Sequence, residues 1–164
     1  GLAKGHKTQL APTNGAMGYG VPAGIAAAML SRRTVFTITG DGDFLMTGQE
    51  LATAVQHGAK TIILLLNNSS YGTIRMHQER EYPTHVSGSE LRNPDFCALA
   101  RAYGYAAECL THTEEFAPAL HRALAATTGT LIEVKLDLEV ITIRSTLSAI
   151  RHQALQAKGR SDLV

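Results

Sequence analysis

The segment Thr34–Asp43 reads TVFTITGDGD, and its pattern decides the fold. Its first part, 34–39, is rich in β-branched and aliphatic side chains, which predicts a strand. Glycines and carboxylates follow that strand at once. A second strand is predicted at 61–66, where the residues are apolar on both faces, as in a central strand covered by helices on each side. Asn67 and Asn68 follow it directly, so both strands end in polar residues.

The rest of the chain alternates between predicted strands and predicted helices. Two more strands are predicted at 105–110 and 130–136. Helices are predicted at 20–28, 93–103, 114–126 and 145–157, with Asn93 and Thr113 as the N-caps of the second and third. A further helix is predicted after the first strand. It starts either at a capping box formed by Thr47 and Glu50 or already at 44–46. The small-residue helix 20–28 is expected to pack closely against a neighbour. This alternation predicts a three-layer α/β/α fold with a mostly parallel sheet.

Composition limits the kinds of partner. The 164 residues are 45% hydrophobic and 18% charged, which is typical of one globular domain. The formal charge of +1 excludes a strong field toward nucleic acid or an anionic membrane. The longest apolar run, Ile62–Leu66, is too short to span a bilayer. Cys97 and Cys109 form no disulfide or zinc motif, so we expect two buried thiols in a reducing cytoplasm.

The chemistry is predicted where the first two strands end. Parallel strands bring their carboxyl ends to one edge of the sheet, and 27 residues separate Asp41 from Asn68. A carboxylate, an amide oxygen and a main-chain carbonyl from the turn after Asn68 suit Mg²⁺. These ligands do not fill an octahedron, so water and phosphate oxygens are expected to complete it. Gly40 and Gly42 leave room for a diphosphate, and the following helix directs free N–H groups toward that anion.

This arrangement resembles the thiamine diphosphate (ThDP) signature. GDGDFLMTGQELATAV from Gly40, NNSSYGTIR from Asn67 and NGAMGYGVP from Asn14 are similar to the acetolactate synthase group. The resemblance implies a ThDP-binding fold in which residues 1–164 are a single diphosphate-binding domain, the C-terminal fragment of a longer enzyme. Residues 145–164 would be its C-terminal helix and tail.

The resemblance also implies roles for individual residues. Mg²⁺ would be held by Asp41, Asn68 and the main-chain carbonyl of Ser70. The carbonyl of Gly15 would accept from the aminopyrimidine, and Met17 would bend the cofactor into a V shape; ordinary core filling is the alternative for Met17. None of these residues is expected to be catalytic, because the cofactor carries the carbanion chemistry. The implied cofactor-binding residues are Gly15, Ala16, Met17, Gly40, Asp41, Gly42, Asp43, Asn68, Ser70, Tyr71, Gly72 and Thr73.

The family's activating glutamate lies on a pyrimidine-binding domain, usually of a neighbouring subunit. No part of this chain resembles that domain, so we expect the chain alone to be inactive and the full enzyme to be a homodimer or homotetramer. Residues 1–12 are too polar and glycine-rich to form the family's first strand, so an exposed sheet edge is expected. His77 stands where anabolic acetolactate synthases carry a substrate-selecting tryptophan, which leaves the particular 2-oxo acid open.

Three functions are consistent with these patterns. The first is a ThDP-dependent lyase or transferase that decarboxylates a 2-oxo acid and joins the product to an acceptor; whether a domain outside this chain binds FAD is open. The second is the diphosphate-binding subunit of a two-chain 2-oxo acid decarboxylase, and the third is a non-catalytic remnant domain. One group of polar residues either reaches the substrate pocket or forms a solvated helix face: Arg75, His77, Glu79 and Arg80.

Overall fold

Four parallel strands form the sheet, in the order β1-β2-β4-β3. The computed structural model describes residues 8–31 and 33–161. Each predicted strand is present, and its bounds differ from the prediction by at most one residue. The strands are β1 (Val35–Gly40), β2 (Thr61–Asn67), β3 (Ala106–Leu110) and β4 (Thr130–Lys135).

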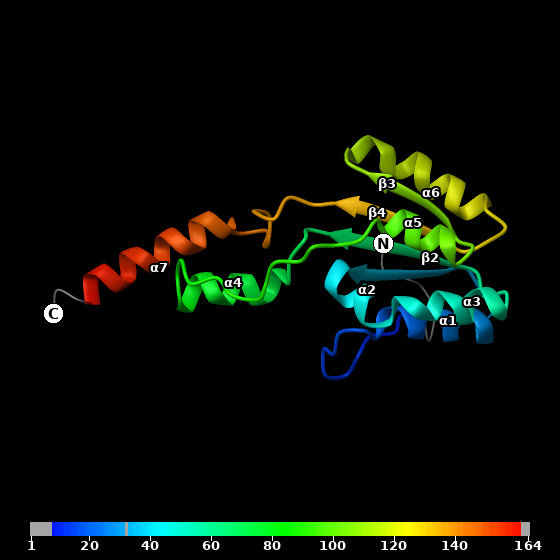
Figure 1. Cartoon of the computed structure of the whole chain (residues 1–164), viewed down its shortest axis with the longest axis horizontal. Helices are drawn as coiled ribbons and strands as arrows, with labels where there is room; N and C mark the ends of the chain where they lie inside the picture. The colour runs from blue at the N-terminus through cyan, green and yellow to red at the C-terminus, as the bar shows by residue number, and fades with distance from the viewer. Residues whose placement is uncertain (1–7, 32, 162–164) are drawn as a thin grey trace.

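Helices cover both faces of the sheet, which confirms the three-layer prediction (Figure 1). α1, α2, α3 and α5 pack on one face, with α6 on the other. On the first face the rings of Phe44 and Phe96 meet edge to face, with centroids 5.6 Å apart. The helices are α1 (Gly20–Ser31), α2 (Asp41–Thr47), α3 (Leu51–Gln56), α4 (Gly72–Glu81), α5 (Phe96–Ala102), α6 (Phe116–Ala125) and α7 (Leu147–Ser161), with 3-10 turns η1 (Gly48–Glu50) and η2 (Thr113–Glu115).

The central strand β2 is buried on both of its faces, as its apolar run predicts. Ile63 faces the larger core and is fully buried, while Ile62 faces α6 and is 1% exposed. Burial of alternate residues on opposite faces follows from the pleat of the strand. The two apolar cores on either side of β2 therefore hold the strand that ends at the predicted site.

The small residues of α1 let this helix approach β1 closely. A Cβ added to Gly24 would lie 2.0 Å from the Oγ1 atom of Thr37 on β1, so only glycine fits there without a shift. This contact confirms the expected close packing of the 20–28 segment. No helix in residues 8–31 or 33–161 is long and apolar enough to cross a membrane.

β1 lies at one edge of the sheet. The sequence predicts no strand in residues 1–12. Residues 8–12 have no regular secondary structure, and residues 1–7 lie outside the described residues. On the face opposite α1, Phe36 and Ile38 are 52% and 67% exposed. The described part of the chain therefore has the expected free edge, beside an uncovered apolar surface.

The helix that follows β1 begins earlier than its predicted capping box. α2 starts at Asp41, and the Thr47 hydroxyl donates to the carbonyl of Gly18 at 3.0 Å instead of capping a helix. The carboxylate of Glu50 accepts from Thr53 at 2.8 Å. The capping-box prediction is wrong because a tertiary contact occupies the threonine, while the alternative start at 44–46 lies inside α2.

Two further N-cap predictions are also wrong. Asp95, not Asn93, caps α5 by accepting from the backbone N–H of Ala98 at 2.9 Å. His112, not Thr113, caps η2 and forms a capping box with Glu115, whose carboxylate accepts from the His112 N–H at 3.0 Å. In both places the observed cap lies within two residues of the predicted one, so only the boundary was misplaced.

The two cysteines differ in burial. Cys97 is 5% exposed, and burial raises the pKa of its thiol to about 11, so it is an inert protonated side chain. Cys109 is exposed on β3, which corrects the prediction that both thiols are buried. Cys97 lies on α5 and packs into the larger core, whereas Cys109 lies near the end of the edge strand β3 and is not part of either core.

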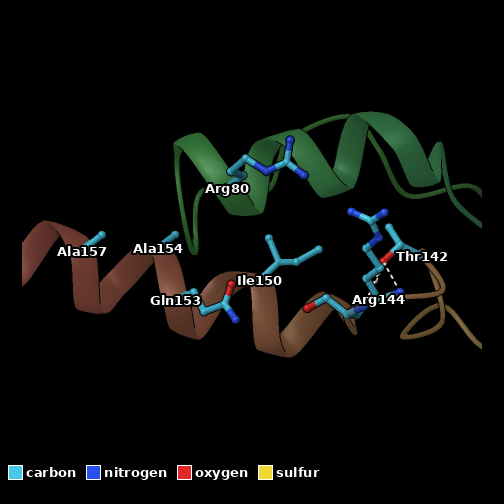
Figure 2. Close-up of a pocket in the computed structure, with 8 residues that line it drawn as sticks. Arg80, Thr142, Arg144, Ile150, Gln153, Ala154 and Ala157 are labelled. Atoms are coloured by element: carbon cyan, nitrogen blue, oxygen red, sulfur yellow. Dashed lines mark hydrogen bonds between the residues drawn. The ribbon is translucent and has the colours of Figure 1, made fainter.

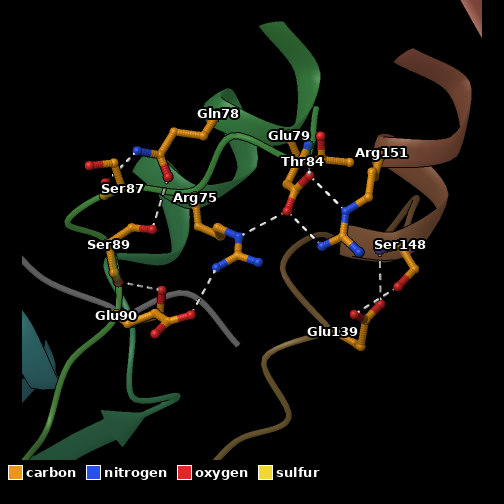
Figure 3. Close-up of polar contacts among 11 residues, drawn as sticks. Arg75, Gln78, Glu79, Thr84, Ser87, Ser89, Glu90, Glu139, Ser148 and Arg151 are labelled. Atoms are coloured by element: carbon orange, nitrogen blue, oxygen red, sulfur yellow. Dashed lines mark hydrogen bonds and ion pairs between the residues drawn. The ribbon is translucent and has the colours of Figure 1, made fainter. Parts of the chain in front are cut away.

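α4 and α7 lie side by side, away from the sheet (Figure 1), and an ion-pair network joins them (Figure 3). Glu79 of α4 is fully buried and accepts from Arg75 at 3.1 Å and from Arg151 of α7 at 2.6 Å. The hydrogen bond from Arg151 is the main reason why the pKa of Glu79 falls to about 2. Arg75 and Glu79 therefore do not form a solvated face, and the carboxylate of Glu79 is already engaged by two arginines.

Replacing Glu79 with glutamine should destabilise the packing of α7 on α4 by about 3 kcal/mol, because two arginines then lose a buried partner. Since folding lowers the pKa of Glu79 below its usual 4.5, its stabilisation is complete above that pH and is lost as pH falls toward 2. Urea unfolding followed by circular dichroism between pH 7 and pH 2 measures both effects.

Glu108→Gln is the matched control. Its partner Arg122 is 59% exposed, so this solvent-screened pair should contribute much less to stability than the buried one. Equal losses for the two variants would contradict a structural role for the buried pair.

Candidate functional site

The register of β1 and β2 places the predicted site residues at one edge of the sheet. Gly40 pairs with Leu66, so Asp41 and Asn67 follow at the same level on neighbouring strands. Neighbouring strands lie about 4.8 Å apart. Asn68 comes one residue later, in the turn that leads to α4. The carboxyl ends of the two strands therefore meet here, as the sequence predicts.

Asn93 joins the two strand ends. Its side-chain N–H group donates to the Asp41 carboxylate at 2.7 Å and to the Asn67 side-chain oxygen at 3.0 Å. The other carboxylate oxygen of Asp41 accepts from the backbone N–H of Gly42 at 3.0 Å. Sequence reasoning missed this contact because Asn93 before a proline is also a good N-cap. The better cap two residues later, Asp95, was the available signal that Asn93 is free for another role.

Asn67 fixes the turn that carries Asn68 and Ser70. Its side-chain oxygen accepts from the backbone N–H of Ser69 at 3.0 Å, where the chain has a φ of 55°. The Asn68 side-chain oxygen accepts from the N–H of Ser70 at 3.1 Å, which holds its rotamer and leaves a second lone pair. The Asn67 amide also donates to Glu133 on β4 at 2.6 Å. The turn is thus tied to the centre of the sheet.

The buried carboxylates differ in how their charge is compensated. Glu79 is paired with arginines, and Glu133 accepts from Lys135 at 2.5 Å. Asp41 is 3% exposed, yet within residues 8–31 and 33–161 its partners are neutral N–H groups and no basic side chain pairs with it. Burying an uncompensated carboxylate is costly, so this position favours a cation.

Tyr71 and Gly72 form the second wall of this edge. A Cβ added to Gly42 would lie 2.4 Å from the Tyr71 ring, and one added to Gly72 would lie 2.9 Å from the Asn68 amide. Gly42 is therefore required by the tyrosine ring, which is a packing reason that the sequence did not reveal. A Cβ at Gly40 would meet only Asp43, at 4.0 Å, so the space beside Gly40 is open.

The turn that carries Gly15, Ala16 and Met17 is held against α2. Asp43 accepts from the Gly18 backbone N–H through one oxygen and from the Thr39 hydroxyl, at 2.6 Å, through the other. Met17 is 42% exposed, so ordinary core filling does not explain it. The predicted pyrimidine-side residues are thereby anchored to the helix that begins at Asp41.

The far end of α4 is a separate region. A hollow of about 540 Å³ lies between α4 and α7, with Arg80 on one helix and Ile150 on the other (Figure 2). None of the predicted cofactor residues lines it. His77 and Arg80 are exposed on α4, in agreement with a solvated face. Among the described residues, no group of three or more histidine, cysteine, aspartate or glutamate side chains is placed to hold a metal ion.

Comparison with known proteins now identifies the family. Residues 2–134 match the model of the thiamine pyrophosphate enzyme, C-terminal TPP binding domain. The chain belongs to this family. Its TPP-binding domain carries the two strand ends described above, and the predicted resemblance is confirmed.

Acetolactate synthases are among the relatives of this TPP-binding domain. The large subunit of Corynebacterium glutamicum is 41% identical over 115 residues, which cover 66% of this chain and 18% of the relative. Isozyme 3 of Escherichia coli is 38% identical over 67% of this chain and 20% of the relative. The mitochondrial catalytic subunit of Saccharomyces cerevisiae is 37% identical over 77% of this chain and 18% of the relative. The chain spans about a fifth of the length of these relatives.

A solved structure shares the fold. The thiamine diphosphate-dependent 4-hydroxybenzoylformate decarboxylase of Rhodococcus jostii RHA1 superposes with a TM-score of 0.71 at 33% identity. The match covers 76% of this chain and 24% of that protein. It supports the ThDP-binding fold that the sequence predicts.

In this TPP-binding domain, Gly42→Ala should lower the free energy of unfolding by about 1–2 kcal/mol, because the new methyl group overlaps the Tyr71 ring. Alanine's better helix propensity offsets only part of that cost. Gly40→Ala, whose Cβ has room, is the matched control and should change stability by less than about 0.5 kcal/mol. Urea unfolding of both variants measures the difference, and equal effects would show that the tyrosine ring is not the constraint.

Proposed function

We propose that this domain binds the Mg²⁺-diphosphate end of ThDP as part of a 2-oxo acid decarboxylase or carboligase similar to acetolactate synthase. The observation that carries the proposal is the buried Asp41, which has neutral hydrogen-bond donors and no basic partner in the described part of the chain. A divalent cation offsets that charge.

The proposed ligands of the ion are Asp41, Asn68 and the main-chain carbonyl of Ser70. All three supply hard oxygen atoms, which Mg²⁺ prefers, and they leave positions for water and phosphate oxygens. Hydrogen bonds to the side chains of Asp41 and Asn68 hold both before any ligand arrives. This ordering supports a site that needs little rearrangement to bind an ion.

The proposed diphosphate cradle lies where two helices begin at the same edge. α2 starts at Asp41 and α4 at Gly72, so the free N–H groups of their first turns are available to an anion. Asp43 would contribute its backbone N–H from α2, and Gly72 and Thr73 would contribute theirs from α4. The proposed contribution of Gly42 requires that its N–H turn from the Asp41 carboxylate to the phosphate. The open space beside Gly40 supports a close approach of the ligand to the backbone.

The chain's own residues would bind and orient the cofactor. Bound ThDP supplies the thiazolium that stabilises a carbanion next to the former carbonyl carbon. The carbonyl of Gly15 would accept a hydrogen bond from the aminopyrimidine, with Ala16 beside it, and the exposed Met17 would support the bent conformation. The carboxylate of Asp43 anchors this turn by accepting hydrogen bonds from Gly18 and Thr39. Its backbone N–H would be the group that meets the phosphate.

The whole enzyme is proposed to need a second domain. A pyrimidine-binding domain, from a neighbouring subunit of a homodimer or homotetramer, would supply the activating carboxylate, and the chain alone would be inactive. The relatives include proteins described as a synthase and as a decarboxylase, which supports a 2-oxo acid substrate and leaves both reaction types within the proposal. A two-chain decarboxylase and a non-catalytic domain are favoured by no particular contact. The cytoplasmic location and FAD in another domain stay predictions.

Asp41→Asn tests the metal proposal through stability. Without metal, the variant should be close in stability to the wild type, because removal of an uncompensated buried charge offsets the loss of one accepted hydrogen bond. With Mg²⁺ and ThDP present, the wild type should gain stability by binding and the variant should not. Thermal unfolding of the 164-residue chain with and without both ligands measures the two effects.

Titration calorimetry completes this test. Asp41→Ala should weaken Mg²⁺-ThDP binding at least about 10–100-fold, the range typical of changes next to metal ligands. Asp137→Ala, which removes an exposed carboxylate after β4, is the control and should leave binding unchanged. Binding that survives in Asp41→Ala would exclude Asp41 as a ligand of the ion.

A further inference from the structure

Asn93 occupies a fixed position between the two strand ends. Its N–H₂ group meets two acceptors, a carboxylate oxygen of Asp41 and the side-chain oxygen of Asn67. Those partners determine which end of the amide is the donor, because neither acceptor atom can donate. The orientation of the Asn93 side chain is therefore set by its contacts.

Asn67 is itself held too firmly to release Asn93. Its oxygen accepts from the Ser69 N–H at 3.0 Å and from the Ser69 hydroxyl at 3.3 Å. Its amide donates to Glu133, whose carboxylate is in turn paired with Lys135. A chain of hydrogen bonds thus runs from the middle of β4 through Asn67 and Asn93 to Asp41.

The side-chain oxygen of Asn93, unlike its N–H₂ group, has no hydrogen-bond partner among the described residues. It is also buried. A buried acceptor without a donor is unfavourable, so such an atom points to a donor that the protein itself does not supply. It belongs to the same amide that holds Asp41.

We infer that Asn93 is a positioning residue of the metal site, with two tasks. Its N–H₂ group fixes the carboxylate of Asp41 for the ion, and its oxygen accepts a hydrogen bond from a water molecule of the ion's hydration shell. Mg²⁺ usually keeps several waters, and groups that hydrogen-bond a metal ligand tune its affinity. The inference rests on the proposed function and adds a residue outside the signature motifs.

The test uses Mn²⁺ as a spectroscopic substitute for Mg²⁺, with the 164-residue chain and ThDP. Asn93→Leu keeps a side chain of similar size and removes both polar groups. It should weaken Mn²⁺ binding, measured by electron paramagnetic resonance, about 10–100-fold. The relaxation of solvent water protons by bound Mn²⁺ should also show faster exchange of a coordinated water that has lost its acceptor. A purely structural role would not change that exchange.

Two further variants keep the result interpretable. Asp95→Ala removes the N-cap of α5 two residues away, so it lowers stability without touching the site and should leave the Mn²⁺ affinity unchanged. Asn93→Ser retains a hydroxyl and should bind Mn²⁺ with an affinity between those of the wild type and Asn93→Leu. It also serves as the test variant if the leucine variant does not fold.

The outcomes separate the inference from the function. If Asp41→Ala abolishes Mn²⁺ binding while Asn93→Leu and Asn93→Ser bind within twofold of the wild type, the inference is wrong and the proposed function stands. If the wild type binds no Mn²⁺ with ThDP, or Asp41→Ala binds as well as the wild type, both fail. If the affinity falls but water exchange is unchanged, the role assigned to the oxygen of Asn93 is wrong.

Discussion

The parallel pairing of β1 with β2 is the constraint on which the site depends. Its register sets Gly40 beside Leu66, which brings Asp41 level with Asn67, so that Asn93 donates to both. Shifting the register by one residue would turn Asp41 toward the other face of the sheet. The two apolar cores that bury both faces of β2 prevent such a shift. Packing far from the polar residues therefore determines where they meet.

Charge compensation distinguishes Asp41 from the other two buried carboxylates described above. Glu79 and Glu133 are buried beside basic side chains. Glu79 joins α4 to α7 through Arg151, and Glu133 joins β4 to β2 through Asn67. Asp41 is equally buried but is stabilised by dipoles alone in the described part of the chain. Because neutral donors orient a carboxylate without neutralising it, the position keeps its attraction for a cation. Composition and net charge alone do not reveal this difference.

The strands and the meeting of the residues that follow β1 and β2 were predictable because their signals are local. Runs of β-branched and aliphatic residues located all four strands, and polar residues directly after β1 and β2 indicated where the proposed site lies. Three predicted helix starts were misplaced. The side chains of Thr47 and Asn93 suit a cap but make tertiary hydrogen bonds instead, and His112 caps the turn in front of Thr113. Only tertiary contacts decide between those uses. The same ambiguity concealed Asn93, whose partners are distant in sequence.

The uncovered side of β1 affects how the isolated chain behaves in solution. Phe36 and Ile38 project from a strand whose outer backbone groups meet no further strand in the described region. Such an edge accepts a strand from another molecule, and the adjacent apolar side chains favour that addition. We therefore expect concentrated samples of this domain to self-associate through this edge. Light scattering across a dilution series measures this association.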